Sequence, residues 1–289
     1  MFPKVALHTS LWGDDWDIVK RSGQEEQELV GLHRIFDTAM DAGLNFWMSD
    51  LSAYGKSEEI LGSFLHEVPR ESYYVSAELF PELMNVSSKS ATDDDIGNIF
   101  AGIVRRLRTG FIDVVWIPNN PEILLEKLIP YAKTGHIGRI GLMCSQLDDV
   151  FKFWNIMRKE DLDAPAVCGN YNLFDRSAET SGLIEWCEYQ GTKFFTSSSG
   201  FHRHKELFEK LFGFAVVKDI AEAHHLSVRE LAIVWAVMKG AVPIIGAYTF
   251  EGGAYSLESI DFAVRIVGAN LSADEIYVLE KFAEEVNKI

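Results

Sequence analysis

The chain alternates between two kinds of segment, and this alternation constrains its fold more than any other feature of the sequence. Short apolar runs typical of buried parallel strands recur eight times, and helical patterns follow them without an interior linker. Eight such alternations predict an α/β fold, a (β/α)8 TIM barrel that forms one domain over residues 1–289. The predicted strands cover 5–9, 44–48, 73–77, 112–117, 139–143, 165–168, 193–196 and 242–245.

The predicted helices carry recognisable boundary signals. Ser227 with Glu230, and Ser272 with Glu275, have the spacing of capping boxes, in which paired side chains satisfy the first backbone N–H groups of a helix. The polar, acidic segment that follows the first strand, up to about Glu26, is expected to be a loop. The predicted helices cover 29–43, 58–65, 92–107, 148–157, 179–189, 205–224 and 228–238, and further helices start at 121 and 272.

Composition limits the class of protein. Apolar residues make up 47% of the chain, and the net charge of −16 argues against nucleic acid and anionic membranes as partners. No apolar run approaches the roughly 20 residues of a membrane span, and the first residues lead straight into a strand, so we expect no signal peptide. The three cysteines are too sparse for a disulfide framework. We therefore expect a cytoplasmic protein.

Polar residues gather where the second predicted strand meets its helix. The stretch from 43 to 62 reads GLNFWMSDLSAYGKSEEILG, with an apolar run before Ser49 and a helical pattern after Ser57. Asp50, Ser52 and Tyr54 fall in the loop that we expect between them. Because ligands of parallel α/β barrels bind at the carboxyl ends of the strands, these side chains are candidates for a functional site.

This stretch resembles the second strand and loop of the aldo-keto reductases, whose pattern is G-[IL]-N-F-x-D-T-A-x-x-Y-G followed by S-E and L-G. The loop is one residue longer here, so the family's aspartate falls on Met48 or on Ser49, and Asp50 lies only nearby. The residues that match the pattern are Gly43, Asn45, Phe46, Tyr54, Gly55, Ser57, Glu58, Leu61 and Gly62.

The resemblance extends over nearly the whole chain and implies a (β/α)8 barrel. The family reduces carbonyl groups with NADPH, using a tyrosine as acid together with an aspartate, a lysine and a histidine. Tyr54 matches this tyrosine. Further matching motifs, in the expected order, lie at 70–71, 106–107, 111–114, 135–137, 140–141, 171–176, 231–235 and 242–247.

Two positions of the catalytic set depart from the family. The resemblance places Glu78 at the position of the lysine and Pro118 at the position of the histidine. The lysine cation stabilises the phenolate of the tyrosine, whereas a carboxylate would oppose it. Of the four residues, the sequence therefore retains Tyr54.

The positions that hold the cofactor in the family also differ. Met143 and Cys144 replace a serine and an asparagine, Cys168 replaces a glutamine, and Ser197 replaces a tyrosine that stacks on the nicotinamide. The segment 241–264 contains no Lys or Arg, although the family meets the 2′-phosphate with basic residues there. We therefore expect no cofactor, with NADP disfavoured and NAD left open, and loss of NADPH-dependent carbonyl reduction.

Other polar residues suggest a different chemistry. By the resemblance, His8 replaces a glycine near Tyr54, Asp50 and Glu78. The main hypothesis is non-redox acid–base chemistry of the isomerase, dehydratase or lyase type on a small polar metabolite, with Glu78 or His8 as base and Tyr54 as acid. The residues expected to bind the substrate are Trp116, Asn119, Asn170, Tyr171, Ser197 and Ser198.

Two alternatives stay open. The first is a non-catalytic binding or accessory protein, a pseudoenzyme, that holds a small-molecule ligand, a protein partner or a second copy of itself. The second is an atypical NAD(P)H-dependent oxidoreductase that relies on Tyr54. No closely spaced ligand motif predicts a metal site. Because consecutive strands of a barrel are neighbours, His8, Tyr54 and Glu78 are expected to line one cavity at the carboxyl end of the first three strands.

Overall fold

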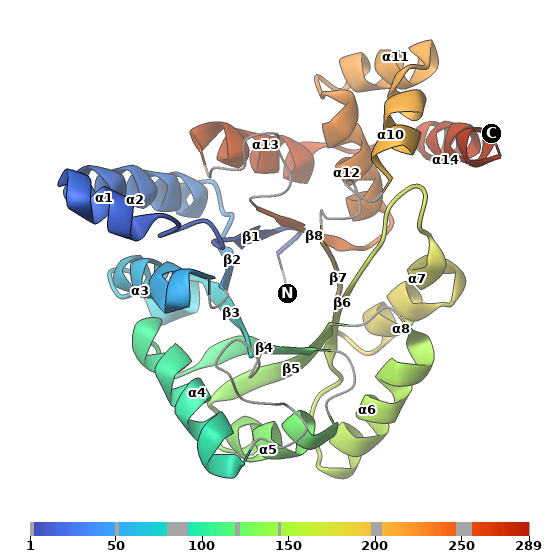
Figure 1. Ribbon diagram of the computed structural model, residues 1–289. Helices are drawn as coiled ribbons and strands as arrows, with labels where there is room; N and C mark the ends of the chain where they lie inside the picture. Colours follow the sequence, from blue (N-terminus) through green and yellow to red (C-terminus); the bar gives the residue numbers. More distant parts are fainter. Residues whose placement is uncertain are drawn as a thin grey trace.

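The predicted (β/α)8 barrel is confirmed. A computed structural model describes residues 3–49, 52–79, 92–118, 122–143, 146–197, 204–246 and 256–288. Eight parallel strands pair in chain order, and the last pairs with the first, so the sheet closes (Figure 1). The strands are β1 (Ala6–His8), β2 (Phe46–Ser49), β3 (Tyr74–Glu78), β4 (Ile112–Pro118), β5 (Ile137–Met143), β6 (Ala166–Gly169), β7 (Phe194–Ser197) and β8 (Val242–Ile245).

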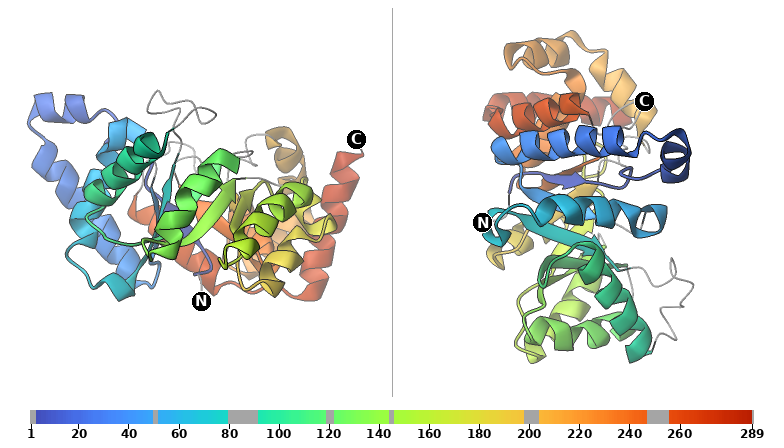
Figure 2. Two further views of the ribbon diagram at one scale, coloured as in Figure 1. Left: turned by 90° about the horizontal axis from the view of Figure 1, so that it is seen from below. Right: turned by 90° about the vertical axis from the view of Figure 1, so that its left-hand side faces the viewer.

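Helices surround the barrel on the outside, as the two side views show (Figure 2). The capping boxes of α12 and α14 are both present as predicted. The helices are α1 (Trp16–Ser22), α2 (Glu25–Asp41), α3 (Ser52–Leu65), η1 (Arg70–Ser72), α4 (Asp93–Arg106), α5 (Glu122–Lys133), α6 (Leu147–Lys159), α7 (Ser177–Thr180), α8 (Leu183–Tyr189), α10 (Lys205–Phe212), α11 (Ala215–Ala223), α12 (Val228–Met238), α13 (Leu257–Gly268) and α14 (Ala273–Asn287).

Several predicted boundaries are wrong, for local backbone reasons. Gly182 has a left-handed φ of 79° and separates α7 from α8, where the sequence predicts one helix. Phe214 is extended and separates α10 from α11 in the same way. The acidic segment predicted as a loop contains α1, and α13 has no counterpart among the predicted helices.

The loop expected between β2 and its helix is also shorter than predicted. Ser49 is the last residue of β2, and α3 begins at Ser52, so Tyr54 lies in the first turn of a helix rather than in a loop. The next residue, Gly55, has a φ of +86°, and a Cβ there would lie 2.5 Å from Nε of Arg106. A glycine is therefore needed at the point where α3 packs against α4.

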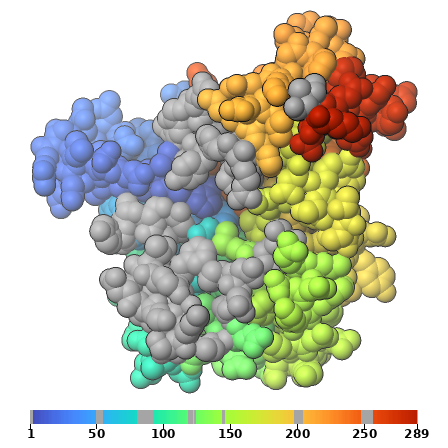
Figure 3. Space-filling model, turned by 45° about the vertical axis from the view of Figure 1, so that its right-hand side comes forward, coloured from blue at the N-terminus to red at the C-terminus, as the bar shows by residue number. Residues whose placement is uncertain are grey.

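Two apolar layers hold the fold together. One fills the barrel interior, where Phe46, Trp116 and Phe195 are at most 1% exposed. The larger layer lies between the strands and the helices. On the outside, α14 lies against α10 and α11, which form one flank of the molecule in the space-filling view (Figure 3). In the described ranges, none of the helices has both the length and the apolar character needed to cross a bilayer.

Candidate active site

Two polar side chains meet at the carboxyl end of the barrel, an opening that we call the mouth and define by His8 and Glu78. His8 is the last residue of β1 and Glu78 is the last residue of β3. Their side chains are 15% and 13% exposed, and Nε2 of His8 lies 3.7 Å from Oε1 of Glu78. The structure thus brings together two of the residues that the sequence analysis placed at one site.

A backbone group determines which nitrogen of the His8 ring carries the proton. The backbone N–H of Ser10 donates to Nδ1 of His8 over 3.2 Å. An accepting Nδ1 places the proton of the neutral ring on Nε2, the atom that faces Glu78. The sequence analysis missed this role, because it depends on the path of the backbone after β1 and not on the identity of Ser10.

Trp116 belongs to the barrel core rather than to the rim. Its side chain is fully buried, and its ring meets that of Phe195 edge to face at 5.1 Å. A Cβ at Gly141 would lie 2.3 Å from this ring, so the neighbouring strand needs a glycine there. The predicted contact between the Trp116 ring and a substrate therefore does not match its position, although its indole N–H has no hydrogen-bond partner among the described residues.

Tyr171 was predicted to contact the substrate, but the structure places it outside the barrel. It is 2% exposed and stacks on Trp235 of α12, with ring centroids 5.0 Å apart. Its hydroxyl donates to Oε2 of Glu179 over 3.2 Å. Burial and the adjacent Glu179 carboxylate raise the pKa of Tyr171 far above its ordinary value. Tyr171 therefore serves the packing of helices, and its prediction as a rim residue is wrong.

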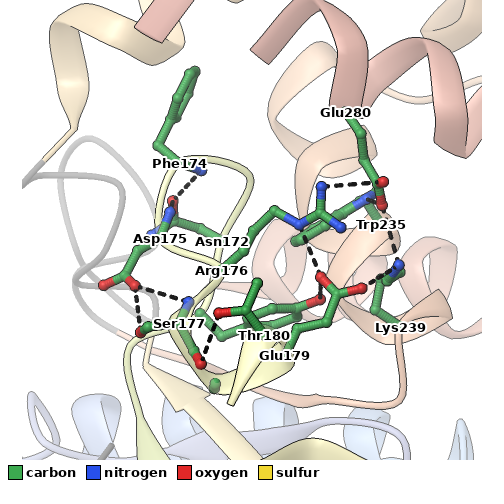
Figure 4. A network of polar contacts seen from close by, with 12 residues as sticks. Asn172, Phe174, Asp175, Arg176, Ser177, Glu179, Thr180, Trp235, Lys239 and Glu280 are labelled. Atoms are coloured by element: carbon green, nitrogen blue, oxygen red, sulfur yellow. Dashed lines mark hydrogen bonds and ion pairs between the residues drawn. The ribbon is translucent and has the colours of Figure 1, made fainter. Parts of the chain in front are cut away.

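Tyr171 contacts a larger group of polar and charged side chains, the outer network, whose members Arg176, Glu179, Trp235, Lys239 and Glu280 are labelled in Figure 4. Nε of Arg176 donates to Glu179 over 2.8 Å, and Nζ of Lys239 lies 2.5 Å from the same carboxylate. Glu280 accepts from the Trp235 indole and from Lys239, each over 3.1 Å. The outer network consists of Tyr171, Arg176, Glu179, Trp235, Lys239 and Glu280.

Among the remaining predicted site residues, the structure describes the side chain of Asn170 but not those of the others. Asn170 follows β6 and is partly exposed. Ser49, one of the two candidates for the family's aspartate position, is buried, and its hydroxyl donates to the carbonyl of Ser76 over 3.1 Å. Its hydroxyl is thus engaged in the sheet. Outside the described residues lie Asp50, Asn119 and Ser198, and outside the described side chains lie Tyr54 and Ser197.

Comparison with known proteins identifies the family of this chain. The model of the Aldo/keto reductase family matches residues 11–281, which is nearly the whole chain. The chain belongs to the aldo-keto reductase family. Among its relatives in this family, a protein of Schizosaccharomyces pombe named as an aryl-alcohol dehydrogenase is 24% identical over 93% of this chain and 94% of its own. The methylglyoxal reductase YeaE of Escherichia coli is 22% identical over 96% and 90%.

Solved structures of other aldo-keto reductases share the fold. A thermostable aldo-keto reductase in complex with the inhibitor epalrestat superposes with a TM-score of 0.73, at 19% identity over 97% of this chain and 95% of its own. An aldo-keto reductase of Klebsiella pneumoniae, solved with NADP and acetate, gives 0.74 at 20% identity over 96% and 90%. At these identities the likeness concerns the fold.

These comparisons correct the main functional hypothesis. The predicted loss of carbonyl reduction and the predicted absence of a nicotinamide cofactor are wrong, since the family is one of reductases and its relatives are named as dehydrogenases and reductases or were solved with NADP or NADPH. The error was to treat every missing side-chain contact as a missing function. Backbone N–H groups at the ends of strands and helices also hold phosphates and amides, and a sequence does not reveal them.

Proposed function

We propose that this aldo-keto reductase is an NAD(P)-dependent oxidoreductase that acts on the carbonyl or alcohol group of a small polar molecule and relies on Tyr54. The observation that carries the proposal is the family match over 11–281. The match includes the stretch around Tyr54 and the end of β3 at which Glu78 lies.

The barrel interior offers hydrogen-bond donors to the ring end of a nicotinamide cofactor. Three buried donors at or near the ends of β1, β3 and β4 have no hydrogen-bond partner among the described residues: Oγ of Ser10, Oγ of Ser76 and Nε1 of Trp116. Unpaired buried donors are uncommon in folded proteins, so a ligand carboxamide or hydroxyl that accepts from them would be favourable. Ser76 and Trp116 are 0% exposed, so of these three donors Ser10, two residues after the end of β1, is the one that we expect to reach the cofactor. Met143 and Cys168, at family cofactor positions, offer sulfur instead.

The acid–base part of the reaction falls to Tyr54. A bound nicotinamide supplies or accepts the hydride. Tyr54 lies at the position of the family's acid. Its phenolic O–H would donate a proton to the substrate oxygen during reduction, and its phenolate would take a proton from the substrate hydroxyl during oxidation. By the resemblance, Glu78 and Pro118 replace the lysine and the histidine of the family's four-residue set. The protein would therefore be an atypical member.

The names of the relatives suggest where to search for substrates. Aromatic aldehydes and methylglyoxal are the first compounds to test, with NADH and NADPH in parallel. Oxidation of the reduced cofactor is followed by its absorbance, and its binding is followed by fluorescence. A purified protein that binds neither cofactor, and that reduces none of these compounds with either, would overturn the proposal.

Tyr54→Phe tests the role of the hydroxyl. We expect kcat/KM to fall by about 100-fold or more, the usual contribution of a positioned general acid. Tyr189→Phe is the matched control, because Tyr189 is 85% exposed on α8. Equal activity of the wild type and Tyr54→Phe would assign the proton transfer to another residue.

Two coarser expectations accompany this proposal. We propose that residues 1–289 form one barrel domain, supported by the closed order of strands. The cysteines are sparse, and the described Cys168 and Cys187 are buried, which supports a reducing compartment such as the cytoplasm.

A further inference from the structure

By the resemblance, the mouth carries a carboxylate at a position where the family has a cation. The resemblance places Glu78 at the position of the family's lysine, and the structure places it at the carboxyl end of β3 with 13% of its side chain exposed. Within the described ranges, His8 is the sole basic residue that pairs with Glu78, and neither a Lys nor an Arg does so. A carboxylate so largely removed from water is costly unless a cation or donor accompanies it.

His8 makes only a long contact with this carboxylate. Its Nδ1 already accepts the backbone N–H of Ser10, so Nε2 is the ring nitrogen that faces Glu78. The 3.7 Å between Nε2 and Glu78 also exceeds a hydrogen-bond distance. A contrasting pair exists on the outside of the molecule, where Nε2 of His224 lies 2.8 Å from Glu275. Glu78 therefore has no close cationic partner among the described residues.

We propose that the mouth binds carbonyl compounds that carry a cationic amino group, with the ammonium of the substrate paired to Glu78. This inference rests on the proposed oxidoreductase function of the same site. A bound ammonium would place a positive charge at the position that the family fills with a lysine. The cation would then be supplied by the substrate and not by the protein. The net charge of −16 would favour the approach of such cations, whereas it would repel carboxylates.

Three matched substrates test the inference. They are benzaldehydes that carry an aminomethyl, a hydroxymethyl or a carboxylate group at the meta position, assayed with whichever reduced cofactor supports turnover. We expect kcat/KM for the aminomethyl compound to exceed that for the hydroxymethyl compound by about 10- to 100-fold, the range for a hydrogen bond to a charged group. The carboxylate should be the poorest substrate. A wild type that treats the first two alike would overturn the proposal.

Substitution of Glu78 shows whether the preference comes from this residue. The readout is the ratio of kcat/KM values for the aminomethyl and hydroxymethyl compounds, so a general loss of activity cancels. Glu78→Gln should reduce this ratio to near one, and Glu78→Asp should retain part of it. Glu71→Gln, an exposed change in η1 at the other end of β3, is the control. A ratio unchanged in Glu78→Gln would contradict the assignment.

A binding measurement separates this inference from the proposed function. Benzylammonium and benzyl alcohol are titrated into the wild type and into Glu78→Gln, and binding is followed by NMR. We expect benzylammonium to bind the wild type about 10-fold or more tightly than the variant, and benzyl alcohol to show no such difference. Glu78-dependent binding of benzylammonium without turnover of any aldehyde would overturn the oxidoreductase proposal alone. Turnover without Glu78-dependent binding would overturn the ammonium proposal alone.

Discussion

The mouth and the outer network are both built from charged residues, but they satisfy their charges differently. In the outer network, Arg176 and Lys239 each contact both Glu179 and Glu280, so two cations are matched to two anions. At the mouth, Glu78 faces one histidine at 3.7 Å. Each carboxylate of the outer network thus contacts two cations, whereas Glu78 has one more distant partner among the described residues.

This difference separates charges that stabilise the fold from charges that serve a ligand. The outer network joins α7 to α12 and α14, so its contacts contribute only when these helices are docked (Figure 4). Glu78 at the mouth is expected to lower the stability of the fold instead, because the loss of its hydration on folding is not offset by a close cation until a ligand binds. The same substitution, Glu to Gln, should therefore have opposite effects on stability in the two places.

The largest effect is expected in the outer network. Glu280→Gln removes the charge that accepts from Lys239 and the Trp235 indole and that pairs with Arg176, and it leaves two cations with one carboxylate. Because hydrogen bonds to charged groups are worth about 1.5–3 kcal/mol, we expect the free energy of unfolding to fall by about 2 kcal/mol. Urea denaturation measures this. The control is Glu188→Gln, an exposed change on α8, and an equal loss in both variants would refute a structural role for the network.

A smaller effect of opposite sign is expected at the mouth. Glu78→Gln removes a carboxylate that pairs, in the described part of the chain, with His8 and with no Lys or Arg. The variant avoids the free-energy cost of burying this carboxylate, so its free energy of unfolding should rise by about 1 kcal/mol in the absence of ligand. The same urea titrations measure it. A loss of stability would place Glu78 among the structural charges and remove the contrast.

The smallest effect is a difference in pH dependence. Burial raises the pKa of Glu179, but the hydrogen bonds from Arg176 and Lys239 together outweigh it, so the pKa lies below the usual 4.5. A lowered pKa in the folded state adds stability above about pH 4.5 that is lost as the pH falls through the folded-state value. Between pH 7 and pH 3, the urea midpoint of the wild type should therefore fall more steeply than that of Glu179→Gln. Parallel curves would disprove this contribution.

The sequence predicts the fold well because strands and helices leave strong periodic signals. The eight strands were each predicted within about two residues, and the capping boxes at Ser227 and Ser272 mark the helix starts that the structure has. The helix breaks at Gly182 and Phe214 were missed, because each depends on one local backbone conformation inside an otherwise helical pattern.

The site could be predicted only in outline. The meeting of His8 with Glu78 follows from topology, since both end strands of one barrel. The tautomer of His8 depends on a backbone N–H, and the withdrawal of Tyr171 into the helical layer depends on its partner Glu179, 8 positions later in the chain. The loss of reductase activity was inferred from absent side chains, and the family match corrects it.

The seam at which the barrel closes has a consequence for how the protein is made. β1 pairs with β8, and a Cβ at Gly246, just after β8, would lie 2.8 Å from Cβ of His8. One wall around this histidine is therefore supplied by a segment synthesised more than 230 residues after it. During translation the edge of β1 that faces β8 stays unpaired until β8 has left the ribosome, so the site is completed only after β8 has been synthesised. A chain truncated before Val242 would have no closed barrel in which to place the site.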